Sequence, residues 1–205
     1  MVAIGASGSF PGFLFAVLSA CEARELKALV ICSLGSSMYG ATRPGFTVVD
    51  MVREFQEQGV LSCRLLGYSL GGRNDRNEAL LFPEWGPLVM AEARRLGGNC
   101  IMEPTLEASV AWCAKLYEEA AGASGIACFV GIGGAGVTFG GGEEGACFPN
   151  GLTRRPFEEM PQKGLLRYYL ERGIPVIHLL CVRKLCERWN IPYDANPFVW
   201  RKMRP

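Results

Sequence analysis

Short apolar runs alternate with amphipathic patterns along almost the whole chain. Nearly continuous apolar runs, such as residues 28–32, predict strands that are buried on both faces. Apolar residues three or four positions apart, such as Val48, Val52 and Phe55, predict helices between these strands. The pattern predicts strands at residues 2–5, 27–33, 62–67, 99–102, 126–131 and 174–180. It predicts helices at residues 11–25, 47–58, 85–96, 106–121, 162–172 and 182–190.

Residues at the predicted helix ends support these bounds. Thr47, followed three positions later by Asp50, resembles a capping box at the start of the second helix. A glycine just past a helix favours the left-handed conformation that ends it. Such glycines follow four of the predicted helices, at Gly59, Gly97, Gly122 and Gly173.

The alternation of strands and helices predicts one α/β domain over residues 1–205. We expect a three-layer, Rossmann-like architecture, with helices on both faces of a mostly parallel sheet of about five or six strands. Because the first strand begins almost at the first residue, we also expect an upstream segment, able to carry a membrane anchor, to be missing.

Composition and charge argue against several classes of protein. The formal net charge is +1 with basic and acidic residues mixed, so we expect no nucleic-acid partner. No apolar run reaches the roughly 18 residues of a membrane span, and no signal peptide precedes the first strand. The nine cysteines lack metal-binding spacing, so we interpret those in apolar runs as buried, reduced thiols. We expect no metal and no cofactor.

The predicted strand ends carry the candidate chemistry. In parallel sheets, ligands bind beyond the carboxyl ends of the strands. The segments 5–9 and 33–40 follow consecutive strands and are both rich in glycine and serine, so we expect them to lie side by side. Two further polar segments, 68–75 and 131–142, follow later strands.

Residues 5–9, Gly-Ala-Ser-Gly-Ser, differ from the GxSxG nucleophile elbow only in the last position. A serine hydrolase would use Ser7 or Ser9 as nucleophile and His178, the single histidine, as base. A lone histidine in an apolar strand is, however, more often a core residue. The following helix offers free amides and a positive dipole end to an anion. We therefore rank anion binding first, a structural turn second and a nucleophile third.

Polar side chains at other strand ends extend the candidate anion site. Ser36, Ser37 and Tyr39 follow the second strand, whereas Arg73 and Asp75 follow the third. An arginine can bind a carboxylate through two parallel hydrogen bonds. The alternative is a solvated turn in which Asp75 caps a helix.

Residues 131–136 match the dinucleotide-binding motif GxGxxG after a strand. That motif also needs a helix that opens at once, and residues 137–145 show no helical pattern. The segment 131–151 is therefore expected to contain no element of its own. It is either a loop whose backbone, at Gly133 and Gly134, approaches a ligand, or a mobile surface loop.

Four segments, taken in order, resemble the poly-gamma-glutamate system protein family. They read GASGSFPGFLFAVLSACEA, SLGSSMYGATRPGFTVVDM, YSLGGRNDRN and RGIPVIHLL…IPYD, and the resemblance spans residues 2–194. The family accompanies the machinery that makes or exports poly-gamma-glutamate, and its members usually carry an upstream membrane anchor. The tail after Asp194 departs from the family. The resemblance implies a pathway, capsule biosynthesis, rather than a reaction.

Residues and resemblance together leave three hypotheses. The first is an accessory component of a poly-gamma-glutamate biosynthesis or export system that binds the polymer or a gamma-glutamyl precursor at the strand-end face. Its further partner would be the membrane-bound synthesis machinery. The second is a serine-dependent hydrolase or transferase acting on gamma-glutamyl bonds, and the third is a nucleotide- or phosphate-binding module. The family's anchor favours a membrane-associated location, whereas reduced cysteines favour the cytoplasm.

Overall fold

A computed structural model of the chain describes residues 1–35, 42–78, 84–140 and 148–193. Seven strands form one sheet in the order β6-β5-β2-β1-β7-β9-β8. Neighbouring strands are parallel except the pair of β9 and the edge strand β8, which is antiparallel. The strands are β1 Val2–Ser7, β2 Ala28–Ser33, β5 Arg64–Ser69, β6 Cys100–Ile101, β7 Cys128–Ile132, β8 Gly151–Thr153 and β9 Val176–Leu179. A separate hairpin pairs β3 Thr42–Arg43 with β4 Phe46–Thr47.

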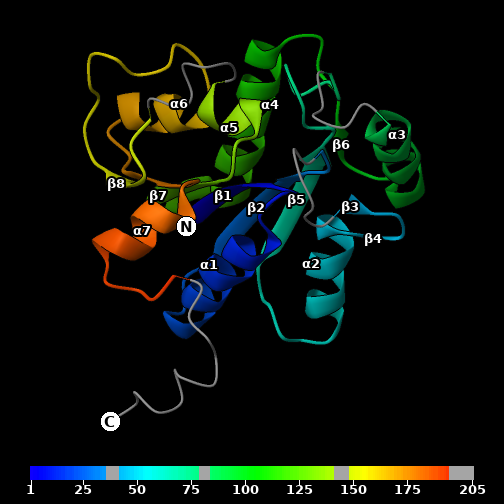
Figure 1. The fold of residues 1–205 in the computed structure, drawn as a ribbon, viewed down its shortest axis with the longest axis horizontal. Helices are drawn as coiled ribbons and strands as arrows, with labels where there is room; N and C mark the ends of the chain where they lie inside the picture. Colours follow the sequence, from blue (N-terminus) through cyan, green and yellow to red (C-terminus); the bar gives the residue numbers. More distant parts are fainter. Residues whose placement is uncertain (36–41, 79–83, 141–147, 194–205) are drawn as a thin grey trace.

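Helices cover both faces of the sheet, as Figure 1 shows. Alternate residues of a strand point to opposite faces. Ile4 and Val30 therefore pack with helices α1, α2 and α3, whereas Ala3, Leu29 and Phe129 pack with α4, α5 and α6. The helices are α1 Pro11–Ala23, α2 Val48–Glu57, α3 Trp85–Leu96, α4 Leu106–Ala121, α5 Gly136–Phe139, α6 Leu165–Glu171 and α7 Val182–Arg188, with a 3-10 turn at Gly122–Ser124. The predicted three-layer α/β architecture is confirmed.

The predicted capping residues are also confirmed, although α1, α6 and α7 are two to four residues shorter than predicted. The Thr47 hydroxyl accepts a hydrogen bond from the Asp50 amide, and the Asp50 carboxylate accepts one from the Thr47 amide at 2.7 Å. The four predicted capping glycines all have positive φ, between 53° and 75°. Local sequence thus determines where these helices begin and end.

The main corrections concern short elements. The sheet has seven strands rather than five or six, and α5 lies within the segment 131–151, where no element was expected, while β8 begins at its last residue. β8 has three residues and α5 four, so neither is long enough to show a periodic pattern. A helical turn does open at Gly136, but it ends at Phe139.

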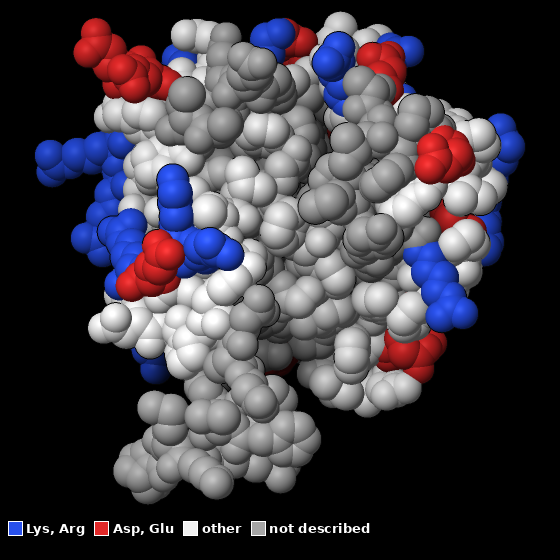
Figure 2. All heavy atoms as spheres, viewed as in Figure 1, with Lys and Arg blue, Asp and Glu red and all other residues white. Residues whose placement is uncertain are grey.

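The described surface carries both signs of charge. On the face shown in Figure 2, basic and acidic side chains of the described residues are interspersed. Among the described helices, none is both long and apolar enough to cross a membrane.

Candidate functional site

Three serines lie next to one another across three adjacent strands at the carboxyl edge of the sheet. Ser7 of β1 pairs with Ser33 of β2, which pairs with Ser69 of β5. They are 5%, 2% and 0% exposed. Because paired residues of parallel strands project to the same side, these side chains face the α4 layer. We call these residues the serine row.

A register shift in β5 brings Ser69 into this row. Val30 of β2 pairs with Leu65, but the next residue, Ile31, pairs with Gly67. Leu66 is therefore an extra residue in β5, which is a β-bulge. If Leu66 were kept and paired with Ile31 without this shift, Tyr68 rather than Ser69 would lie opposite Ser33.

The segments that follow these strands are in direct contact. The Gly8 amide donates to the Ser33 carbonyl, and the Gly35 amide donates to the Leu70 carbonyl, both at 2.9 Å. A Cβ atom on Gly35 would lie 2.7 Å from that Leu70 oxygen, so this approach requires glycine. The expectation that the first two strand-end segments lie side by side is confirmed as far as Gly35. Ser36, Ser37 and Tyr39 lie outside the described residues.

Asp75 is the buried acid of this edge. It is 1% exposed, and its Oδ1 accepts hydrogen bonds from the Ser69 hydroxyl at 2.6 Å and the Gly71 amide at 3.2 Å. Burial raises the pKa of Asp75 to about 6, although the hydrogen bonds from Ser69 and Gly71 and the nearby Ser109 hydroxyl act in the opposite direction. Asp75 does not cap a helix, since α3 begins ten residues later, at Trp85.

The loop that holds Asp75 turns through left-handed conformations. Asn74, Asp75 and Asn77 all have left-handed φ values, of 56°, 61° and 63°. Asn and Asp are the non-glycine residues that adopt this conformation most readily. The burial of Asp75, rather than the backbone of the loop, therefore distinguishes it from a simple solvated turn.

Several buried oxygen atoms near the serine row have no hydrogen-bond partner in the part of the chain that the structure describes. They are Ser33 Oγ, Asp75 Oδ2, Ser109 Oγ and Thr138 Oγ1. Ser33, Ser69 and Thr138 are among the residues that line a small, partly enclosed cavity of about 10 Å³ between the sheet and helices α4 to α6. Buried polar atoms are nearly always paired, so this cluster is unusual.

The N-terminus of α1 is the second feature of this edge. No side chain caps it and its first turn holds no acid, whereas Thr47 caps α2 and Thr105 caps α4. The amides of Gly12 and Phe13 have no acceptor among the described residues. A Cβ atom on Gly12 would meet no atom within 4 Å, so the space beside it is open.

Ser7 and Ser9 connect the serine row to this helix. Their hydroxyl oxygens are 3.3 Å apart, and the Ser9 amide donates to the Ser7 hydroxyl at 3.3 Å. Ser7 is thus buried in the turn that leads into α1.

His178 is not brought to these serines. Gly5 of β1 pairs with Gly131 of β7, which pairs with His178 of β9. Two strand spacings amount to about 10 Å, and Ser7 lies about 7 Å further along β1. The Thr138 side chain occupies the space over Gly5 and Gly131, where added Cβ atoms would lie 2.9 and 2.6 Å from it. The hypothesis that His178 acts as the base for a Ser7 or Ser9 nucleophile is therefore not supported by the strand order.

His178 lies instead in the core. It is 0% exposed, its ring packs edge-on against Phe148 at 5.7 Å, and neither ring nitrogen makes a hydrogen bond in the described part of the chain. Burial lowers the pKa of His178, while backbone groups of Phe148, Gly133 and Pro149 oppose this effect. The imidazole is thus held in its neutral form.

The other candidate ligand groups differ in availability. The Gly133 amide donates to the Leu179 carbonyl at 2.8 Å, so it is not free to bind a ligand. Gly134 is exposed. Arg73 is also exposed, and no described residue forms an ion pair with it, whereas Arg76 pairs with Glu78 at 3.3 Å.

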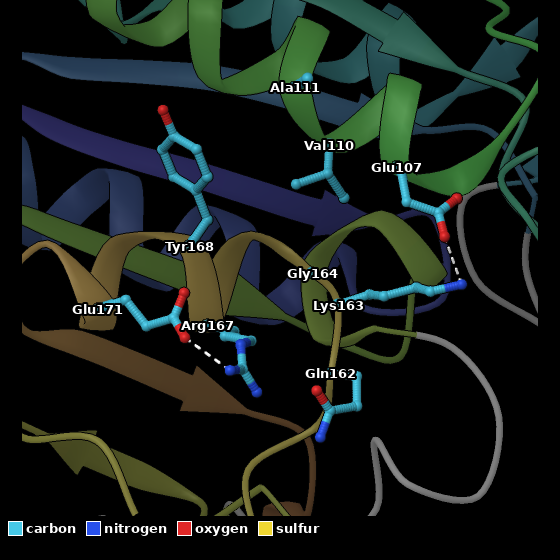
Figure 3. Close-up of a pocket in the computed structure, with 9 residues that line it drawn as sticks. All are labelled: Glu107, Val110, Ala111, Gln162, Lys163, Gly164, Arg167, Tyr168 and Glu171. Atoms are coloured by element: carbon cyan, nitrogen blue, oxygen red, sulfur yellow. Dashed lines mark ion pairs between the residues drawn. The ribbon is translucent and has the colours of Figure 1, made fainter.

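A separate groove of about 230 Å³ lies between α4 and α6 (Figure 3). Lys163 pairs with Glu107 at one end, and Arg167 pairs with Glu171 at 2.6 Å at the other. These charges already neutralise one another, and none of the sequence-predicted site residues lines the groove.

Of the eight cysteines that the structure describes, four are buried and four are half-buried. The eight that the structure describes are free thiols, and burial raises the pKa of Cys32 to about 12 and that of Cys63 to about 11. No group of three or more His, Cys, Asp or Glu side chains within the described ranges is placed to hold a metal ion.

Sequence reasoning placed Ser33, Ser69 and Thr138 in the strand-end segments without singling them out, and it missed Ser109 as part of this polar cluster. A signal was present for the serine row, because three apolar strands each end in serine: VAIGAS, ALVICS and RLLGYS. Ser109 and Thr138 lie within helices and carried no comparable signal.

Comparison of the chain with protein-family models, with curated protein sequences and with solved structures finds no match. The resemblance to the poly-gamma-glutamate system family therefore stays a prediction.

Proposed function

We propose that this protein is an accessory component of a poly-gamma-glutamate system that binds a carboxylate of the polymer, or of a gamma-glutamyl precursor, at the carboxyl edge of the sheet. The observation that carries the proposal is the uncapped N-terminus of α1 beside the serine row. Free amides and the positive end of the helix dipole favour a bound anion by about 0.3 to 2 kcal/mol.

A second contact comes from Arg73. It follows β5, which is two strands from β1 in the sheet, or about 10 Å. A polymer with a carboxylate on every residue could place one group at the amides of Gly12 and Phe13 and another at the Arg73 guanidinium. Repeated contacts of this kind suit a polyanion better than a single small anion.

The hydrolase hypothesis has less support. Ser7 and Ser9 have no imidazole within reach, and Ser69, the serine bonded to Asp75, is 0% exposed. A phosphate would suit the same amides, so the experiment must compare the two anions.

The test is calorimetric titration of the protein with a short gamma-glutamyl oligomer. Gly12→Glu places a carboxylate where the ligand would bind, and Gly12→Gln is its matched neutral control, since the space beside Gly12 is open. We expect Gly12→Glu to weaken binding about five- to tenfold and Gly12→Gln to have little effect. Arg73→Ala should weaken binding about three- to tenfold and lower its salt dependence.

Absence of binding to the unmodified protein, or equal affinities of both Gly12 variants, would overturn the proposal. Tighter binding of inorganic phosphate or ATP than of the oligomer would instead favour the phosphate-binding hypothesis.

A further inference from the structure

The surface formed by α7 and the residues that follow it carries exposed apolar side chains. Just after α7, Asn190 adopts a left-handed φ of 51°, a conformation that commonly ends a helix. Around this turn, Trp189, Ile191 and Tyr193 are 64%, 54% and 46% exposed. Single exposed apolar residues are normal, whereas three within five residues form a patch. We call residues 182–193 the α7 patch.

The α7 patch is also basic. Arg183, Lys184 and Arg188 are exposed, and none of them forms an ion pair with a residue that the structure describes. Within residues 182–193, Glu187 is the one acidic residue. Figure 2 shows basic side chains gathered over α7, at the left of the view, around one acidic side chain. Positive charge and apolar surface therefore occur together here.

The amino-acid sequence shows that the charge of the chain is unevenly distributed. Residues 181–205 hold six basic and two acidic side chains, whereas residues 1–180 hold 15 basic and 18 acidic ones. Two of the four tryptophans, Trp189 and Trp200, also belong to this last segment. The net charge of +1 thus combines a basic C-terminal segment with an acidic remainder, and such a segment is attracted to anionic surfaces.

We propose that the α7 patch binds the surface of a membrane that contains anionic lipids. Its three cations pair with lipid phosphates, and its three apolar side chains enter the boundary between the headgroups and the acyl chains. Tryptophan and tyrosine favour this boundary because their rings have an apolar body and a polar tip. Basic residues beside them add attraction to anionic headgroups. This surface is separate from the proposed polymer contact and does not depend on it.

A dissolved polyanion, whether the polymer or a nucleic acid, matches the α7 patch less well. It would pair with the cations but would leave Ile191 and most of Trp189 in water. The bases of a nucleic acid would also need the faces of the aromatic rings. The Arg183 guanidinium lies over the Tyr193 ring, 5.2 Å from its centroid. That of Arg188 lies 5.9 Å from the centroid of Trp189, so one face of each ring already carries a cation.

The test is co-sedimentation of the protein with vesicles of phosphatidylcholine alone, or of equal parts phosphatidylcholine and phosphatidylglycerol. We expect binding to the anionic vesicles to be about tenfold tighter or more. Trp189→Ser should weaken it about five- to tenfold, and the double variant Arg183→Gln, Lys184→Gln about tenfold or more. In α4, Trp112 is 41% exposed with Lys115 over its ring at 4.8 Å. Trp112→Ser and Lys115→Gln are therefore matched controls that should keep binding.

All the substituted side chains are exposed, so each variant is expected to fold, and an unchanged melting temperature checks this. Absence of binding to the anionic vesicles, or equal losses in Trp189→Ser and Trp112→Ser, would overturn the proposal. Vesicle binding that depends on the cations but not on Trp189 would also overturn it. If the double variant instead weakened binding of a gamma-glutamyl oligomer and no vesicle bound, the α7 patch would be a polymer contact.

Discussion

The two halves of the carboxyl edge of the sheet differ in how the space beyond the strands is filled. Beyond β1, β2 and β5, the space beside Gly12 is open, and the Ser33 hydroxyl, Asp75 Oδ2 and the first amides of α1 stay without partners among the described residues. On β7 and β9, the space is filled: Phe10 packs on Gly133, Thr138 on Gly131 and Phe148 on His178. There, the amides of Leu180 and Cys181 donate to the Asn150 side chain at 3.1 and 2.6 Å. We therefore expect ligand binding at the ends of β1, β2 and β5, and only a packing role at the ends of β7 and β9.

The largest expected effect comes from disturbing the packed half. Gly133 has φ +78°, and an added Cβ would lie 2.9 Å from Ser7 Cβ and 2.6 Å from the Phe10 ring. Backbone strain and overpacking should together lower the free energy of unfolding of Gly133→Ala by about 3 kcal/mol. In Gly134→Ala the nearest atom would be 3.7 Å away, so this control should change stability by less than about 0.5 kcal/mol. Chemical denaturation measures both, and similar losses would contradict the packing difference.

The next effect is the pH dependence that Asp75 imposes. Its pKa is raised by burial to about 6 in the folded protein, so folding favours the protonated carboxyl. The resulting stabilisation is complete below about pH 4 and is lost as pH rises through 6. The free energy of unfolding should fall by about 2 to 3 kcal/mol over this range.

Asp75→Asn should abolish this slope, whereas Glu78→Gln should retain it. Of the neighbouring ionisable groups, the thiols of Cys100 and Cys113 stay neutral in this range, because burial raises the pKa of each. Urea titrations at successive pH values measure the slope. A slope that persists in Asp75→Asn would assign it to another group.

The smallest expected effect is that of replacing His178, which tests whether this residue belongs to the core or to the binding site. Because this side chain is 0% exposed and two strands away from β1, we expect His178→Gln to lower the free energy of unfolding by only about 1 to 2 kcal/mol. Binding of the gamma-glutamyl oligomer should be unchanged. Titration calorimetry on the folded variant checks this, and lost binding would return His178 to the site.

Local patterns predicted much of the fold. The bounds of α3 and α4, at residues 85–96 and 106–121, agree with the predicted ones, because caps and apolar stripes act within a few residues. The end of β5 was predicted two residues too early, since Ser69 is polar although it lies inside the strand. Short elements such as β8 depend on a neighbouring strand rather than on their own sequence.

The candidate site was only partly predictable. Asp75 was singled out from its loop, but its pairing with Ser69 depends on a left-handed turn that no periodic pattern records. The relation of Ser7 to Ser33 and Ser69 depends on the strand order β5-β2-β1, which is a property of the whole sheet. The same strand order places His178 of β9 two strands away from Ser7 of β1.

The extra residue in β5 also bears on how sequences related to this one should be aligned. A related chain that lacks Leu66 would pair regularly along β5 and would still bring its serine opposite Ser33, because Gly67 would then follow Leu65 directly. A related chain that keeps Leu66 but pairs without the shift would instead bring Tyr68 opposite Ser33. The Tyr68 hydroxyl, which now donates to the carbonyls of Ala93 and Gly97 at 3.0 and 2.8 Å, would then face the opposite layer. A gap of one residue before the GYS of β5 is thus compatible with a serine hydroxyl at this position, whereas an alignment without a gap does not by itself show which side chain lies there.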